Sequence, residues 1–247
     1  MKIAEGIEAL EIPMDFLGSS GGVINPVVAW DEKEGATLFD AGMPGQLPAI
    51  EEGLGKLGLR LSSVKRILLT HQDLDHIGGA PAIVEAVHAG VYAHTGDVPF
   101  IQGELPLLKL DPKRLEARMA ALPAERRAQA MKLLSSPPRV KVDHPLSGGE
   151  ELPFHGGIVV IPTPGHTPGH VSYYLKAHRV LVAGDAMRVE GGSLIGPSPM
   201  ATPDMRRAVA SLHNLLPWKI DAVVCYHGGL IKRDIATRLS ALTRIST

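Results

Sequence analysis

The sequence has a single cysteine, almost no net charge and no long apolar run. The lone Cys225 excludes an internal disulfide framework and a cysteine-built zinc cluster. Lys and Arg number 25 against 26 Asp and Glu, so the overall charge predicts no non-specific binding to nucleic acid. No apolar run reaches the roughly 18 residues that a transmembrane helix needs. A length of 247 residues with 45% hydrophobic content is enough to bury a core.

The first residues, MKIAEGIEALEIP, mix glutamates with apolar residues and lack the apolar core of a signal peptide. We therefore expect a cytoplasmic protein, a monomer or homodimer, with a small-molecule substrate and neither a membrane nor a nucleic-acid partner. Eleven histidines are the compositional oddity, and their positions carry more information than their number.

Short apolar runs that are typical of strands alternate with helical spacings along the chain. Strands are predicted at 7–12, 22–30, 36–39, 64–70, 91–93, 158–161, 171–175, 180–183 and 222–225, and helices at 46–58, 82–87, 203–216 and 231–245. The Arg- and Ala-rich stretch 111–136 indicates two helices broken at Pro123. We interpret 111–136 as a helical cap inserted into a single domain, 1–247; the alternative is two ordinary surface helices.

The strongest local signal is the stretch THQDLDHIGG at 70–79. It places four potential metal ligands within six residues, directly after a predicted buried strand: His71, Asp73, Asp75 and His76. Residues two apart in an extended chain point the same way, so His71 and Asp73 can face one metal while the next pair faces a second.

Three further motifs place a His or an Asp at the end of a strand, next to glycines. They are PGHTPGH with His166 and His170, AGD with Asp185, and YHGG with His227. Polar residues in such places are how a rigid sheet presents a site on loops.

The order H-x-D-x-D-H, then His, Asp and His, resembles the metallo-β-lactamase-fold hydrolase superfamily, as does the early LFDAG with Asp40. The resemblance covers nearly the whole chain and implies an α/β fold, a four-layer αβ/βα sandwich with a dinuclear metal site at one edge. It implies that His71, Asp73 and His166 hold one metal, that Asp75, His76 and His227 hold the other, and that Asp185 bridges both. Asp40 would orient a ligand histidine from behind, and His170 is interpreted as structural or as a similar support.

Residue 73 departs from the family's usual pattern, which has a histidine there. The flavodiiron proteins resemble this variant, with a glutamate. Three carboxylates give a less positive centre and favour harder metals. We therefore expect two divalent ions, with zinc leading and iron or a mixed zinc–iron pair as alternatives.

The resemblance implies hydrolysis of an ester, lactone or thioester by a metal-bridging hydroxide, with Asp75 passing a proton to the leaving group and no Ser or Cys nucleophile. Lactonases of this fold carry a Tyr where this chain has Arg188. Glyoxalase II uses basic residues near the C-terminus, and Lys232 and Arg233 are candidates, although such residues are usually solvated. Cys225 and Tyr226 are expected in the core, and the six remaining histidines at the surface or at helix caps.

Three other classes remain as alternatives. A non-haem di-iron redox enzyme of the flavodiiron type would fit the carboxylate at 73 but would need a separate electron donor. A phosphodiesterase or nuclease is disfavoured by the near-neutral charge. A non-catalytic relative is disfavoured because all seven ligand-capable residues are present.

Overall fold

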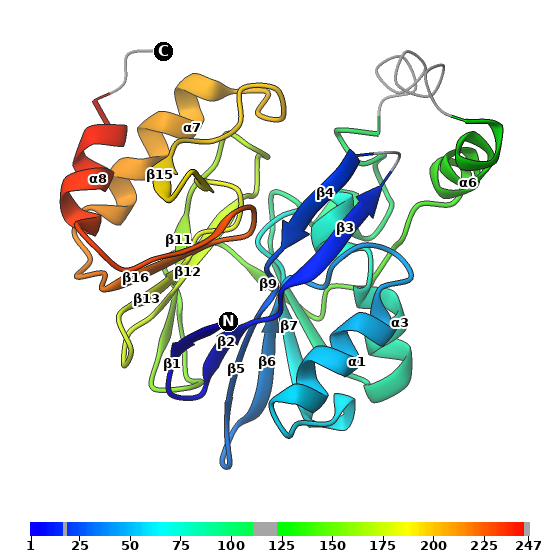
Figure 1. Ribbon diagram of the computed structural model, residues 1–247, viewed down its shortest axis with the longest axis horizontal. Helices are drawn as coiled ribbons and strands as arrows, with labels where there is room; N and C mark the ends of the chain where they lie inside the picture. Colours follow the sequence, from blue (N-terminus) through cyan, green and yellow to red (C-terminus); the bar gives the residue numbers. More distant parts are fainter. Residues whose placement is uncertain (17–18, 111–122, 245–247) are drawn as a thin grey trace.

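Two facing β-sheets with helices on their outer faces make up the protein (Figure 1). The computed structural model describes residues 1–16, 19–110 and 123–244. The predicted four-layer αβ/βα sandwich is confirmed, since each sheet packs one face on its partner and the other on helices.

The first sheet has seven strands in the order β1-β2-β5-β6-β7-β8-β9. Strands β6 to β9 run parallel, so their carboxyl ends lie at one edge. The strands are β1 Lys2–Ala4, β2 Ile7–Ala9, β5 Val27–Asp31, β6 Gly35–Phe39, β7 Val64–Leu68, β8 Gly90–His94 and β9 His144–Leu146. The helices on this side are α1 Leu47–Lys56, η1 Leu61–Ser63, α2 Leu74–Ile77, α3 Ala80–Val87 and α4 Val98–Ile101.

The second sheet has six strands in the order β10-β11-β12-β13-β16-β17, with β13 and β16 parallel. They are β10 Glu151–Leu152, β11 Ile158–Pro162, β12 Val171–Leu175, β13 Val180–Val182, β16 Ala222–Cys225 and β17 Gly229–Ile231. Helices α7 Met205–Ser211, η2 Leu212–Leu215 and α8 Ile235–Leu242 cover its outer face. Two hairpins lie outside the two large sheets: β3 Ile12–Phe16 with β4 Ser19–Ile24, and β14 Arg188–Glu190 with β15 Ser193–Ile195.

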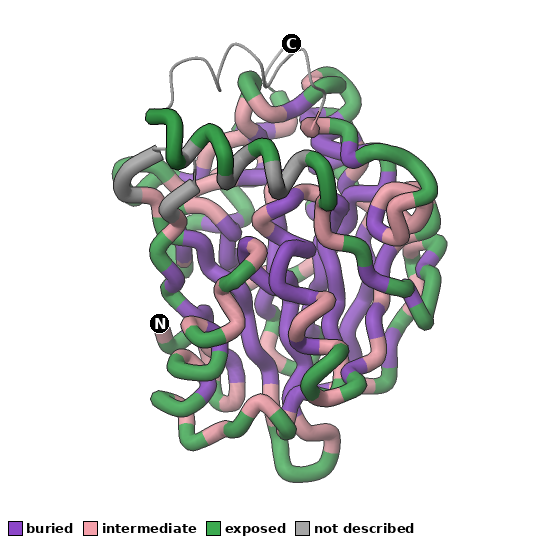
Figure 2. Tube along the Cα trace, turned by 90° about the vertical axis from the view of Figure 1, so that its right-hand side faces the viewer, coloured by how far each residue is buried: buried purple, intermediate pink, exposed green. Residues whose placement is uncertain are grey.

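Strict alternation along the central strands explains the layering. In β11, Ile158 and Val160 pack between the sheets, while Val159 and Ile161 pack against the helices. Because successive side chains point to opposite faces, a strand that is apolar throughout must be covered on both sides. Figure 2 shows the result as buried strands through the middle of the molecule, with exposed turns around them.

Three predicted elements are wrong in their extent. The runs 7–12 and 22–30 are each split between two strands, the second at the Asn25–Pro26 step, because proline has no N–H to continue a ladder. The last helix begins at Ile235 rather than at 231, since Ile231 ends β17 and Asp234 turns the chain with a φ of 54°.

The structure describes only part of the predicted insert 111–136. Residues 111–122 lie outside the described residues, and α6 Ala124–Ser135 forms the second half. Figure 1 shows α6 at the same end of the molecule as the β3–β4 hairpin and α7. The role of a cap stays a prediction.

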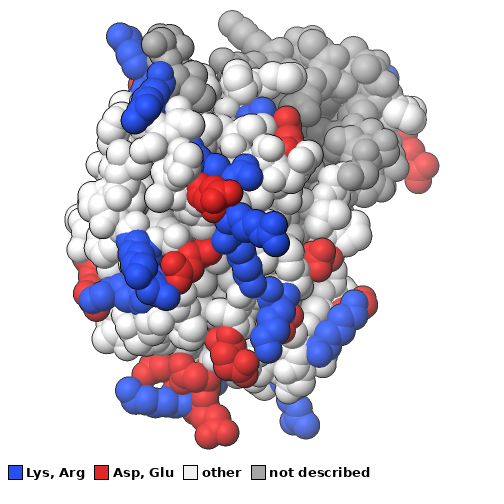
Figure 3. Space-filling model, turned by 60° about the vertical axis from the view of Figure 1, so that its left-hand side comes forward, with Lys and Arg blue, Asp and Glu red and all other residues white. Residues whose placement is uncertain are grey.

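No helix among the described residues is long and apolar enough to cross a membrane. On the face shown in Figure 3, basic and acidic side chains are interspersed rather than gathered by sign. This mixture agrees with the net charge of −1.

Candidate metal centre

Loops at the ends of strands from both sheets bring the candidate residues to one place. Parallel strands β6 and β7 end at the same edge of the first sheet, and β13 and β16 end together in the second. The loops after these four strands, the short helix α2 that follows β7 and the loop between β11 and β12 carry the candidates: Asp40, His71, Asp73, Asp75, His76, Asp185, His227, His166 and His170.

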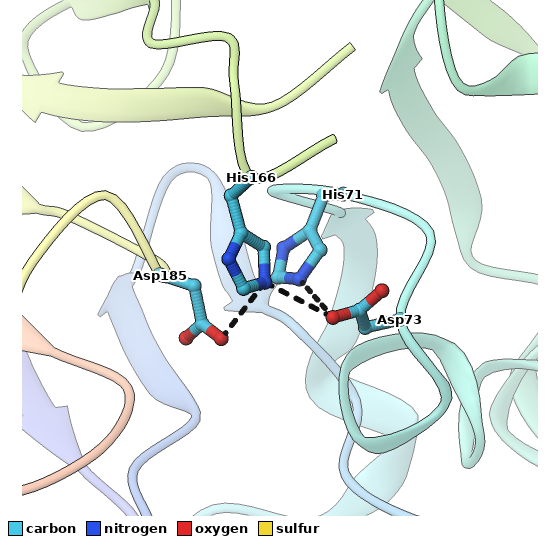
Figure 4. A group of neighbouring side chains, drawn as sticks. All are labelled: His71, Asp73, His166 and Asp185. Carbon is cyan, nitrogen blue, oxygen red and sulfur yellow. Dashed lines mark hydrogen bonds and ion pairs between the residues drawn. The ribbon is translucent and has the colours of Figure 1, made fainter. Parts of the chain in front are cut away.

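Four of these side chains form a first group, drawn in Figure 4. The ligand-capable atoms of His71, Asp73, His166 and Asp185 all lie within 4.8 Å of one another. Asp73 Oδ2 is 3.2 Å from His71 Nε2 and 3.0 Å from His166 Nε2. His166 Nε2 is also 3.2 Å from Asp185 Oδ2.

A second group is formed by Asp75, His76 and His227. Asp75 Oδ2 is 3.2 Å from His227 Nε2 and 3.8 Å from His76 Nε2. Asp185 turns its other oxygen, Oδ1, toward this group, at 3.5 Å from His76 Nε2 and 3.6 Å from His227 Nε2. The seven predicted ligands therefore lie together as two groups, and Asp185 stands between them.

Three atoms in the centre of this arrangement are buried without a hydrogen-bond partner: His71 Nε2, His76 Nε2 and Asp185 Oδ1. An unsatisfied buried polar atom costs about 1–3 kcal/mol, so such atoms call for a partner. Imidazole nitrogens and carboxylate oxygens at this spacing suit divalent cations such as zinc. The donor set fits two metal ions, one at each group.

Asp40 lies behind two of the histidines and fixes their orientation. It is fully buried and accepts hydrogen bonds from His76 Nδ1 at 2.8 Å and from the Thr70 hydroxyl at 2.8 Å. The Thr70 hydroxyl also lies 2.9 Å from His71 Nδ1. With both Nδ1 atoms engaged, the Nε2 atoms are the ones that face the site and are available to a metal ion.

His170 supports Asp185 from behind. Its Nε2 accepts a hydrogen bond from the Asp185 backbone N–H at 3.0 Å, and its Nδ1 lies 2.8 Å from Thr163 Oγ1. Burial lowers the pKa of His170 well below its usual value, so the ring is neutral, as an acceptor must be. The His170 side chain thus holds the backbone of Asp185, the residue proposed to bridge the two groups.

The electrostatics of the site favour ionised carboxylates. Burial acts to raise the pKa of Asp185, but the surrounding histidines, His227 first, outweigh it and hold that pKa well below its usual range. Burial acts to lower the pKa of His166, yet the Asp185 and Asp73 carboxylates raise it to about 9. The negative charge that stabilises a protonated imidazole here would equally stabilise a bound metal cation.

Several contacts of the site were missed by the sequence reasoning. Asp97, which follows β8, is 1% exposed and accepts hydrogen bonds from Gln72 N and Thr167 Oγ1, so it joins the loop of His71 and Asp73 to the loop of His166. Lys109 contacts Asp73 and His166 directly. Neither residue belongs to a motif, and only the fold brings them to the site.

Tyr226 was expected in the core and is indeed buried, but it also touches the site. Its ring lies against that of His76, with centroids 3.8 Å apart, and its hydroxyl donates to the Asp75 carbonyl oxygen at 2.5 Å. Cys225 is buried among apolar residues of the outer core, and burial raises the pKa of its thiol. It is a core residue, as predicted.

The expectation that His155 is a surface or capping residue is wrong. It is 7% exposed, with Nδ1 2.6 Å from Asp31 Oδ2 and Nε2 2.9 Å from Thr37 Oγ1. These bonds join the loop after β10 to strands β5 and β6 of the other sheet. His155 has no potential metal ligand near it in sequence, yet the fold supplies two hydrogen-bond partners from the other sheet.

Comparison with known proteins places this geometry in a family. Residues 20–227 match the family described as the metallo-beta-lactamase superfamily. The chain is 31% identical over 214 residues to the "Probable metallo-hydrolase YflN" of Bacillus subtilis (strain 168), covering 80% of this chain and 76% of that protein. It is 25% identical over 208 residues to the "Hydroxyacylglutathione hydrolase GloC" of Haemophilus influenzae, covering 81% of this chain and 82% of that protein.

Among solved structures, a metallo-beta-lactamase family protein from Thermus thermophilus superposes with a TM-score of 0.72 and 26% identity, covering 97% of this chain and 79% of that one. The matched fold, the matched sequence and the two His/Asp groups agree with one another. The chain belongs to the metallo-β-lactamase superfamily, a metallo-hydrolase family whose sites imply divalent metal ions.

Proposed function

We propose that this protein is a dinuclear-metal hydrolase that cleaves an ester, lactone or thioester bond of a small molecule. The observation that carries the proposal is the pair of His/Asp groups with Asp185 between them and three unpartnered buried atoms at their centre. Bound divalent ions would supply a water of lowered pKa and Lewis-acid polarisation of a carbonyl group. No nucleophilic side chain of the protein is needed for that chemistry.

The chain's own residues divide the remaining work. Asp185 links the two groups, because its Oδ2 lies near His166 and its Oδ1 lies near His76. Asp75 has the most open carboxylate of the three, at 21% exposure against 12% for Asp185 and 10% for Asp73. It can therefore reach a substrate and pass a proton to the leaving group. The Tyr226 hydroxyl steadies Asp75 through its backbone oxygen.

A thioester is a natural first substrate to test, because a relative over most of the chain is named a hydroxyacylglutathione hydrolase. Lys232 and Arg233 are both exposed, but they follow Ile231, which pairs with Val223 toward the end of β16 that lies away from His227. Their position gives no support for contact with a substrate at the two metal groups. Arg188 is engaged by Glu190 at 2.8 Å and by the Gly196 carbonyl at 3.0 Å. With its guanidinium engaged in this way, Arg188 does not take the role of the tyrosine that lactonases of this fold carry at the same position.

The test combines metal content by elemental analysis of untagged protein with hydrolysis of lactone, thioester and aryl ester substrates. We expect near two zinc per chain and turnover of at least one substrate class. Asp185→Asn should lower turnover by at least about a hundredfold and reduce metal content, since it removes a proposed ligand rather than a supporting residue. The control is Asp221→Asn, which alters an exposed carboxylate paired with Arg179.

Full metal content and wild-type turnover in Asp185→Asn would contradict the proposal. Near two iron per chain without hydrolysis would instead favour the di-iron redox alternative, for which the carboxylate at residue 73 is the supporting feature.

A further inference from the structure

Lys109 directs its ammonium group into the first group of the site. Its Nζ donates to Asp73 Oδ2 and lies 2.5 Å from His166 Nε2. The side chain is 23% exposed, so most of it is enclosed. Lys109 belongs to no motif of the sequence, and nothing in the ligand pattern calls for a cation there.

The fold fastens the chain just before this lysine. Leu107 is buried in the core at 5% exposure. The backbone N–H of Leu108 donates to Gln72 Oε1 at 3.0 Å, and Gln72 Nε2 in turn donates to Asp97. The segment before Lys109 is therefore fastened to the loop that carries Asp73. Because the backbone beside it is fixed, the Lys109 side chain is held against Asp73 and His166 instead of extending into solvent.

The ammonium contacts the atoms that a metal ion would need. Zinc binds imidazole nitrogen and carboxylate oxygen at about 2.0–2.2 Å. Asp73 Oδ2 and His166 Nε2 cannot satisfy a metal at that distance while the ammonium stays against both of them. The charge of Lys109 would also repel an incoming cation at this range.

Within the described part of the chain, no lysine or arginine contacts the second group. Among the described residues, the ion pairs of Asp75 are with His76 and His227, and those of Asp185 are with histidines. Imidazoles can act as ligands once they are deprotonated, whereas an ammonium group must leave. The two metal positions of this chain are therefore unequal.

We propose that Lys109 competes with a metal ion for Asp73 and His166, so that the Asp75/His76/His227 position fills first and the Asp73 position binds metal more weakly. The inference rests on the proposed dinuclear site and adds a residue that sets its order of loading.

The test is a Zn²⁺ titration of the metal-stripped full chain against a competing chelator. Wild type should show a tight and a weak step. Lys109→Met should tighten the weak step by about tenfold or more, the size expected for removing one charged hydrogen-bonded competitor, and leave the tight step unchanged. Lys109→Arg, which keeps the charge, should leave the weak step weak. The matched control is Lys141→Met, which removes an 83% exposed lysine paired with Asp143.

Thermal unfolding gives a second readout that does not depend on activity. In chelator, Lys109→Met should melt below wild type because Asp73 loses its partner; in saturating Zn²⁺, its rise in Tm should exceed that of wild type. A direct competitor should keep its effect at high salt, whereas a distant charge effect would be screened.

Two equal binding steps, or the same isotherm in Lys109→Met and wild type, would overturn the role of Lys109 and leave the dinuclear hydrolase standing. No Zn²⁺ binding by either chain would overturn the dinuclear site and this inference together. Two steps in both chains, with only the weaker step tightened in Lys109→Met, would support the inference.

Discussion

Asp40 accepts a hydrogen bond from His76 Nδ1 at 2.8 Å, and this contact determines which nitrogen of the imidazole faces the site. The carboxylate is fully buried and also receives the Thr70 backbone N–H at 2.8 Å. A charged acceptor in such a place favours the Nδ1–H tautomer and leaves Nε2 as the free ligand atom.

Removing this carboxylate should weaken metal binding. Asp40→Ala is expected to lower Zn²⁺ affinity about 10- to 100-fold, because His76 loses its orientation and its basicity. Asp40→Asn keeps the shape and tolerates the backbone φ of 60°, so its loss should be smaller. Chelator competition on both variants measures the difference. Equal affinity in wild type and Asp40→Ala would show that the Asp40 contact is only structural.

Asp73 is expected to set metal preference. Asp73→His restores the family's usual ligand, removes one negative charge and one hard oxygen, and should raise the ratio of zinc to iron bound from an equimolar mixture. Asp73→Glu keeps the charge and the oxygen and should leave the ratio near that of wild type. Elemental analysis after loading gives the ratios. An unchanged ratio in Asp73→His would show that selectivity lies elsewhere.

Asp97 is expected to matter for stability as well as for the site. Its two oxygens accept four hydrogen bonds, from Gln72 N, Gln72 Nε2, Thr167 Oγ1 and Gly169 N, at 2.7–3.2 Å. Asp97→Asn turns an amide toward two of these donors and should lower the free energy of unfolding by about 3 kcal/mol. Urea denaturation measures the loss, with the exposed Asp143→Asn as control. A difference below about 0.5 kcal/mol would mean that the loops hold each other without Asp97.

The close approach of the seven candidate ligands could be predicted because each lies in a short motif at or just after a strand end. Their binding of metal stays a prediction. The layers could be predicted for a similar reason: β11 and β16 alternate between two apolar faces, which requires cover on both sides. Local sequence is sufficient to predict a feature when the residues that form it are close in the chain or recur with the period of a strand or helix.

Lys109 and Asp97 could not be predicted, because the contacts that define them span 36 and 25 residues of chain. A lysine in a leucine-rich loop and an aspartate after a strand are ordinary in sequence, and only the packing of the loops makes them neighbours of Asp73 and Gln72. The same holds for His155, whose partners Asp31 and Thr37 lie in another sheet. Tertiary hydrogen bonds between loops leave no periodic signal.

His155 gives a pH dependence whose sign can be worked out. Burial lowers its pKa below the usual 6.5, even though Asp31 acts to raise it, so the folded state prefers the neutral ring. Below pH 6.5 the unfolded chain takes up a proton that the folded chain resists. Stability from this group is therefore present above pH 6.5 and is lost as the pH falls toward the folded-state pKa.

His155→Gln cannot titrate, so its stability deficit relative to wild type should shrink as the pH falls from about 7.5 to about 5.5, by at most about 1.4 kcal/mol per pH unit. Urea unfolding of both chains across that range, in chelator to remove metal effects, gives the deficit directly. A deficit that grows at low pH would mean that the Asp31 carboxylate outweighs burial and holds His155 protonated in the fold. In that case the contact between β5 and the loop after β10 would be an ion pair rather than a neutral hydrogen bond.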